Sequence, residues 1–91
     1  MKVLPSTVSP YRQTSEFDEN SVPAGLLKSH STKMGVWGKI IVLEGKLVYR
    51  ILEPDIEEII LTPETSGVIE PTVKHEVIPV QSVRFYVEFY Q

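Results

Sequence analysis

A strict alternation near the end of the chain constrains the fold more than any other feature. Four apolar side chains fall on one face of residues 83–90, namely Val83, Phe85, Val87 and Phe89. The positions between them hold Arg84, Tyr86, Glu88 and Tyr90. Because successive side chains of a strand point to opposite faces, this period of two predicts a strand with one buried face. We expect the buried face to form one side of the main core, with Ile40, Val42 and Ile59 nearby.

Further strand signals recur along the chain. Runs of apolar and β-branched residues predict strands at residues 36–43, 46–51, 56–61, 66–69 and 75–80, and residues 11–15 are a candidate edge strand. Glu44 and Gly45 separate two of these runs and predict a hairpin, either with a tight turn or with a type I turn and a glycine bulge. Residues 16–25 predict a loop. No segment has the period of an amphipathic helix, so the pattern predicts an all-β fold.

Composition and charge narrow the class of protein. The 91 residues fit one domain, residues 1–91. A net charge of −3 and scattered basic residues argue against nucleic-acid binding. The chain has no cysteine, which excludes disulfides and thiolate chemistry. It also shows no signal peptide and no apolar run long enough to span a membrane, so we expect a cytoplasmic protein with no membrane partner.

Several short motifs, taken in order, resemble one known family. They are Pro23 to Gly25, His30 to Lys33, Gly35 to Lys39, Val42 to Lys46, Pro63 with Glu64, Glu70 with Pro71, His75, and Phe89 with Tyr90. Together they resemble the small cupin-like family that includes the N-terminal domain of the tellurite-resistance protein TehB and the YeaR-like proteins. The resemblance runs from about residue 10 to the end and implies a cupin-like, double-stranded β-helix (jelly-roll) barrel.

The resemblance also implies a link to tellurite or related stress resistance. Some members of the family are fused to a methyltransferase that uses S-adenosylmethionine. This sequence has no glycine-rich strand–turn–helix segment for such a cofactor, so we expect no methyltransferase activity from it. Whether the chain catalyses another reaction is left open by the sequence.

His30 and His75 are the two histidines and the first candidates for a ligand site. Imidazole binds transition metals such as zinc and iron, and two histidines with one carboxylate would complete a metal site. Glu70, Glu76 and Glu88 are available, and the sequence does not choose among them. Metal-binding cupins usually have four ligands, of which at most these two histidines are present. The plainer alternative is two unrelated histidines that hydrogen-bond to the backbone.

An oxyanion site is the second candidate. Lys33 follows His30 closely and is the preferred cation for such a site, ahead of Lys39, Arg50 and Arg84. Trp37 is a candidate for the floor of the ligand site, although an aromatic residue on a strand more often belongs to the core.

The favoured interpretation is therefore a small cupin-like domain that binds a small molecule or an oxyanion through His30, Lys33, Trp37 and His75. One alternative is a small metal-dependent enzyme with His30 and His75 as ligands. Another is a non-catalytic interaction module that works as a homodimer, which is the oligomeric state we expect because a short domain gains stability by pairing.

Overall fold

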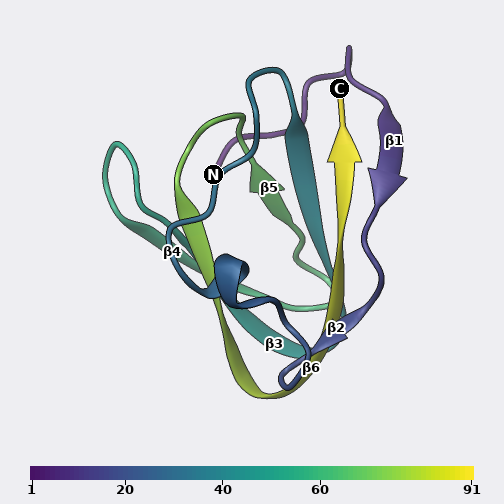
Figure 1. The fold of residues 1–91 in the computed structure, drawn as a ribbon, viewed down its shortest axis with the longest axis vertical. Helices are drawn as coiled ribbons and strands as arrows, with labels where there is room; N and C mark the ends of the chain where they lie inside the picture. Colours follow the sequence, from purple (N-terminus) through teal and green to yellow (C-terminus); the bar gives the residue numbers. More distant parts are fainter.

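Six strands form one antiparallel sheet in the computed structural model, which describes residues 1–91 (Figure 1). The strands are β1 (Pro10–Gln13), β2 (Phe17–Asp18), β3 (Trp37–Ile51), β4 (Glu57–Leu61), β5 (Gly67–Ile69) and β6 (His75–Tyr90). The one helical element is the 3₁₀ helix η1 (Ala24–Leu27), so no helix of the structure is long enough to cross a membrane. The prediction of an all-β fold is confirmed.

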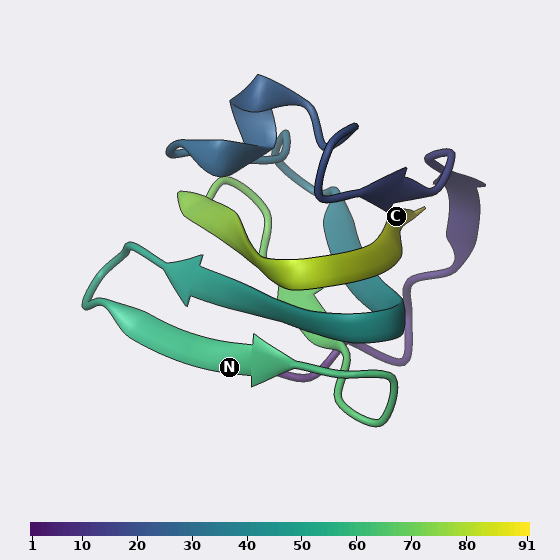
Figure 2. The same ribbon diagram turned by 90° about the horizontal axis from the view of Figure 1, so that it is seen from below.

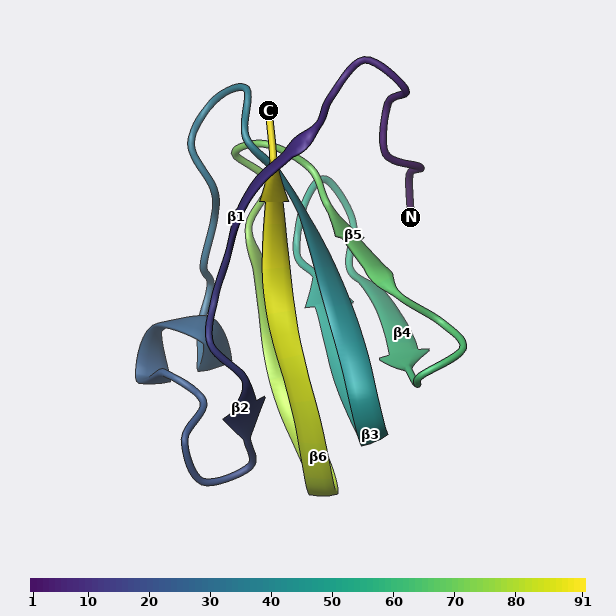
Figure 3. The same ribbon diagram turned by 90° about the vertical axis from the view of Figure 1, so that its right-hand side faces the viewer.

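Two long strands organise the sheet. β3 and β6 pair along almost their whole length, from Trp37 opposite Tyr90 to Ile51 opposite His75. The other edge of β3 pairs with β5 in its first half and with β4 in its second half. The other edge of β6 pairs with β1 and β2. The sheet curves strongly along these strands and gives the molecule a barrel-like form (Figures 2 and 3).

The hairpin predicted at Glu44 and Gly45 is wrong, because β3 continues through these residues without reversing. The register instead slips here, since Val42 faces Phe85 but Glu44 faces Arg84. This bulge adds one residue to β3 and moves its inward side chains from the even positions before the bulge to the odd positions after it. The predicted break between residues 80 and 83 is likewise a bulge within β6, which runs unbroken from His75 to Tyr90.

A core of ten apolar residues lies on the concave side of the sheet. Val83, Phe85 and Val87 are buried there as the alternation predicts, with Ile40 and Val42 beside them. Phe89 and Ile59 are partly buried against the same cluster. Tyr49, Leu47, Leu61, Ile69 and Val77 complete it.

The segment before β3 covers one side of this core. β1 and β2 lie along the edge of β6, and η1 lies over the same side of the sheet (Figures 2 and 3). Residues 16–25, which the sequence predicts to be a loop, contain β2 and part of η1. The carboxylate of Glu19 accepts a hydrogen bond of 3.0 Å from the backbone N–H of Val83, so this acidic segment is attached to β6.

Candidate functional site

His30 and His75 lie side by side although 44 residues separate them in the chain. Each backbone N–H donates to the carbonyl of the other residue, at 2.7 Å and 2.8 Å. The two rings meet edge to face with centroids 5.4 Å apart. The pairing places His30 beside the first residue of β6, and both side chains line one interior cavity.

His75 is the more enclosed of the two, with 1% of its surface exposed. Its Nδ1 lies 3.2 Å from the carbonyl oxygen of Val73, which fits a neutral ring that donates from Nδ1 and keeps Nε2 as an acceptor. The ring of Tyr49 packs against it at 5.8 Å, and the Tyr49 hydroxyl donates to the carbonyl of Val68. Burial lowers the pKa of His75, the hydrogen bond to Val73 opposes this effect, and the nearby His30 lowers the pKa further. Burial therefore favours the neutral form of this ring.

His30 is half-buried, and its Nδ1 is buried without a hydrogen-bond partner inside the protein. Buried polar side-chain atoms nearly always have such a partner, and each exception calls for an explanation. In this chain it is the only buried side-chain nitrogen or oxygen in that condition. The atom belongs to one of the two rings that line the cavity.

The cavity, which we call the inner cavity, has a volume of about 240 Å³ and is partly open to solvent. It lies between the concave side of the sheet and the segment that precedes β3. Most of its lining is apolar, with Phe17, Leu26, Ile40, Ile69, Val77, Phe85, Val87 and Phe89 as the large side chains. Its polar lining consists of Arg12, Thr14, Thr32, His30 and His75.

A second hollow, which we call the outer pocket, adjoins the inner cavity and has a volume of about 230 Å³. Four residues line both spaces, namely Arg12, His30, Thr32 and Phe89. Lys33 lines the outer pocket only, so the structure places it close to His30 but not inside the inner cavity. Arg12 was not singled out from the sequence. Its guanidinium lies 5.7 Å from the centre of the Phe89 ring, at the junction of the two spaces.

The remaining predicted residues lie elsewhere. Trp37 is half-buried at the start of β3 and lines neither space. Arg50 forms ion pairs with Glu58 and Glu76 on the outer side of the sheet. Two further carboxylates, those of Glu16 and Glu44, pair with Arg84. Lys39 lines neither space either.

The donor atoms do not form a complete metal site. His30 and His75 would supply two imidazole ligands, but no group of three or more histidine, cysteine, aspartate or glutamate side chains is close enough to hold an ion together. Catalytic zinc sites ordinarily have three protein ligands. Glu76, one of the carboxylates considered from the sequence, is instead paired with Arg50 at 2.6 Å.

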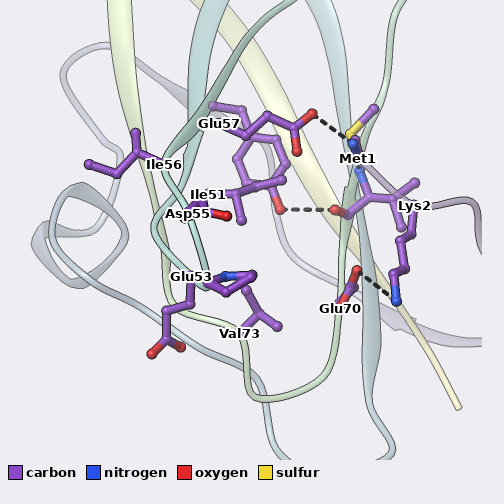
Figure 4. A pocket seen from close by; sticks show the side chains of 12 residues that line it. Met1, Lys2, Ile51, Glu53, Asp55, Ile56, Glu57, Glu70 and Val73 are labelled. Atoms are coloured by element: carbon purple, nitrogen blue, oxygen red, sulfur yellow. Dashed lines mark hydrogen bonds and ion pairs between the residues drawn. The ribbon is translucent and has the colours of Figure 1, made fainter.

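The largest hollow of the molecule contains neither histidine. It has a volume of about 460 Å³ and carries four carboxylates, those of Glu53, Asp55, Glu57 and Glu70 (Figure 4). Two of these are matched by cations of the same chain, because the α-amino group of Met1 lies 2.7 Å from Glu57 and the Lys2 amine 3.8 Å from Glu70. We therefore place the candidate site at the histidines rather than in the largest hollow.

Comparison with known proteins agrees with this architecture. Two proteins from Haemophilus influenzae, each named a probable S-adenosyl-L-methionine-dependent methyltransferase TehB, are 37% and 34% identical to this chain over 74% of its length. The chain spans only 25% of those relatives. The crystal structure of TehB from Haemophilus influenzae superposes with a TM-score of 0.84 at 31% identity and covers 93% of this chain and 32% of that one.

The crystal structure of a protein from Escherichia coli strain K12 superposes with a TM-score of 0.89 and covers 100% of this chain and 97% of that one. Its identity to this chain is 20%, so the similarity shows the fold alone. A model of the TehB-like domain matches residues 12–87, which include β2 to β5 and most of β6. The chain therefore belongs to the TehB-like domain family.

Proposed function

We propose that this chain is a binding domain for a small molecule or an oxyanion, and that the ligand occupies the inner cavity beside His30 and His75. The observation that carries the proposal is the meeting of the His30 and His75 rings, which both line this mostly apolar cavity. A buried polar atom without a hydrogen bond costs roughly 1–3 kcal/mol. The buried Nδ1 of His30 bears such a cost, which is relieved when the ring turns this atom toward a ligand in the cavity.

The composition of the cavity supports the same proposal. Small-molecule sites are typically concave and mostly apolar, with a few polar groups that fix the orientation of the ligand. Here most of the apolar lining comes from the strands, and the polar groups are Arg12, Thr14, Thr32 and the paired His30 and His75. The neutral His75 ring offers an acceptor at Nε2, because its Nδ1 faces the carbonyl of Val73.

An oxyanion is a natural candidate because the polar side of the cavity is cationic. Arg12 and Lys33 both line the outer pocket together with His30. The resemblance to the tellurite-resistance family makes tellurite the first oxyanion to test. The methyltransferase activity in the names of the relatives belongs to proteins of which this chain spans a quarter, and we do not propose it for these 91 residues.

The two alternatives from the sequence, a metal-dependent enzyme and a homodimeric interaction module, receive less support. A metal-dependent reaction would need a third ligand, and the structure does not bring one to His30 and His75. Dimerisation stays a prediction, because the structure describes one chain.

The experiment is a titration followed through the two histidine rings by NMR. Tellurite, selenite, phosphate, benzoate and benzyl alcohol are added one at a time to protein labelled in its imidazoles. We expect at least one of them to shift the ring signals of both histidines in a saturable way. His30→Ala should weaken that binding, whereas Lys39→Ala, a cation outside both spaces, should not. If none of the five compounds moves either ring signal at millimolar concentration, the binding proposal is overturned. Added zinc serves as the comparison, and saturable binding of zinc alone would favour the metal alternative.

A further inference from the structure

Arg12 differs from the other arginines of the chain in having no carboxylate partner. Arg50 and Arg84 each pair with two glutamates, at distances between 2.6 and 2.8 Å. The guanidinium of Arg12 forms no ion pair and rests over the ring of Phe89. An arginine paired with two carboxylates is already neutralised, so Arg12 is the one whose guanidinium is free to recognise an anion.

The surroundings of Arg12 favour an anion. No aspartate or glutamate lines either the inner cavity or the outer pocket, although the chain has 12 acidic residues and a net charge of −3. The same two spaces contain Arg12, Lys33 and both histidines. The only strongly charged side chains at the site are thus positive, in a molecule that is acidic as a whole.

The inner cavity behind Arg12 favours an apolar group. Its wall is formed by side chains such as Leu26, Ile40, Ile69, Phe85 and Val87. An engineered protein cavity of about 150 Å³ with a comparable lining binds benzene. The inner cavity, at about 240 Å³, has room for an aromatic ring together with a short polar group.

We infer that the ligand of this site is a small amphipathic anion, namely a monocarboxylate whose ring-sized apolar body fills the inner cavity while Arg12 binds the carboxylate at the junction with the outer pocket. The guanidinium matches a carboxylate through two parallel N–H groups. His30 lines both spaces and reaches the same end of the ligand. Lys33 lies farther out and contributes mainly through its charge. This inference rests on the proposed function and specifies the chemical class of its ligand.

The test compares ligands of equal shape and different charge. Benzoate, benzamide and benzyl alcohol are titrated against the full chain by calorimetry and by the histidine NMR signals, with acetate as the anion that lacks a ring. We expect benzoate to bind at least about tenfold more tightly than benzamide or benzyl alcohol, because hydrogen bonds between two charged groups are stronger than those to a neutral group. Acetate should bind more weakly than benzoate, and the advantage of benzoate over benzamide should shrink in high salt because Arg12 is exposed.

Variants separate this inference from the proposed function. Arg12→Gln should weaken benzoate binding much more than benzamide binding and so remove most of the advantage of benzoate over benzamide. Arg12→Lys should restore only part of the advantage, because an ammonium lacks the paired N–H groups. Lys28→Gln is the matched control, since Lys28 is exposed and lines neither space. If benzamide binds as tightly as benzoate, or if Arg12→Gln leaves their ratio unchanged, the inference is wrong while the binding function stands. If benzoate leaves the histidine signals unchanged while tellurite, selenite or phosphate shifts them, the inference alone fails. If none of these compounds shifts them, both fail.

Discussion

The backbones of His30 and His75 are joined by two reciprocal hydrogen bonds, and their rings meet edge to face above the core. The pair ties the segment that precedes β3 to the start of β6. It therefore closes one side of the inner cavity and at the same time supplies its two imidazoles. Structure and candidate chemistry depend on the same two residues, so variants at these positions need readouts that separate stability from binding.

We predict that the protein loses stability in mild acid through His75. Burial lowers its pKa in the folded state below the unfolded value of about 6.5, so the folded protein binds fewer protons than the unfolded chain. The contribution of the neutral His75 ring to stability is complete above the unfolded pKa. It is lost as the pH falls from the unfolded pKa toward the lowered folded pKa. The melting temperature should therefore fall as the pH is lowered from about pH 7.5 to pH 5. The range stays above the usual pKa of carboxylates, so their ion pairs contribute little to the decline.

The matched variant for this prediction is His75→Asn, whose side-chain N–H can still donate to the carbonyl of Val73. It should lower the melting temperature at neutral pH but flatten the decline toward acid. A variant with the same acid sensitivity as the original protein would show that another group is responsible.

We predict that Phe85→Ala costs about 3–5 kcal/mol of the free energy of unfolding. Phe85 has no exposed surface and contacts the ring of Phe17 with centroids 5.7 Å apart, so its removal opens a hole between β6 and β2. Urea denaturation measures the loss. Ile60→Ala is the control, because Ile60 is 57% exposed on the outer side of β4 and should change the free energy of unfolding by less than about 0.5–1 kcal/mol. Similar losses for both variants would contradict the assignment of the buried face.

Local patterns in the sequence were enough to predict the strand content and the buried face. The alternation from Val83 to Phe89 survives folding because the extra residue of the bulge lies on β3, so β6 itself runs without an extra residue there. The turn at Gly45 was wrongly predicted because a Glu–Gly pair suits both a hairpin and a bulge. The partner strand determines whether a hairpin or a bulge forms at this pair. The partner of Gly45 is Val83 on β6, which is distant in the sequence.

The candidate site was only partly predictable for a similar reason. His30 and His75 stood out because they are the only histidines, whereas Arg12 carries no local signal. It reaches the site because β1 pairs with β6 and places Arg12 opposite Phe89. Lys33 was expected beside His30, and it lines only the outer pocket. The register of β3 places Trp37 opposite Tyr90, outside both spaces.

We predict that these 91 residues do not bind S-adenosylmethionine. Folds that bind such nucleotide-containing cofactors ordinarily place a glycine-rich loop between a parallel strand and a helix. Every strand pair of this chain is antiparallel, and its one helical element is the four-residue η1. Calorimetric titration should give no heat of binding at micromolar protein. Saturable binding would contradict the prediction and would place a cofactor site within the TehB-like domain.

We predict that Gly45→Ala lowers the free energy of unfolding by more than about 2 kcal/mol, because two separate costs add. Gly45 has a φ of +80°, which side chains disfavour, and a Cβ at this position would clash with the carbonyl oxygen of Ser82. Gly35→Ala isolates the first cost, since its φ is +81° but no atom lies within 4 Å, and it should cost about 1–2 kcal/mol. Gly25→Ala has neither problem and should be neutral or slightly stabilising. Urea denaturation should rank the three in this order. Equal losses at Gly45 and Gly35 would mean that β3 and β6 can separate at the bulge without cost, contrary to the close packing that holds the two long strands together.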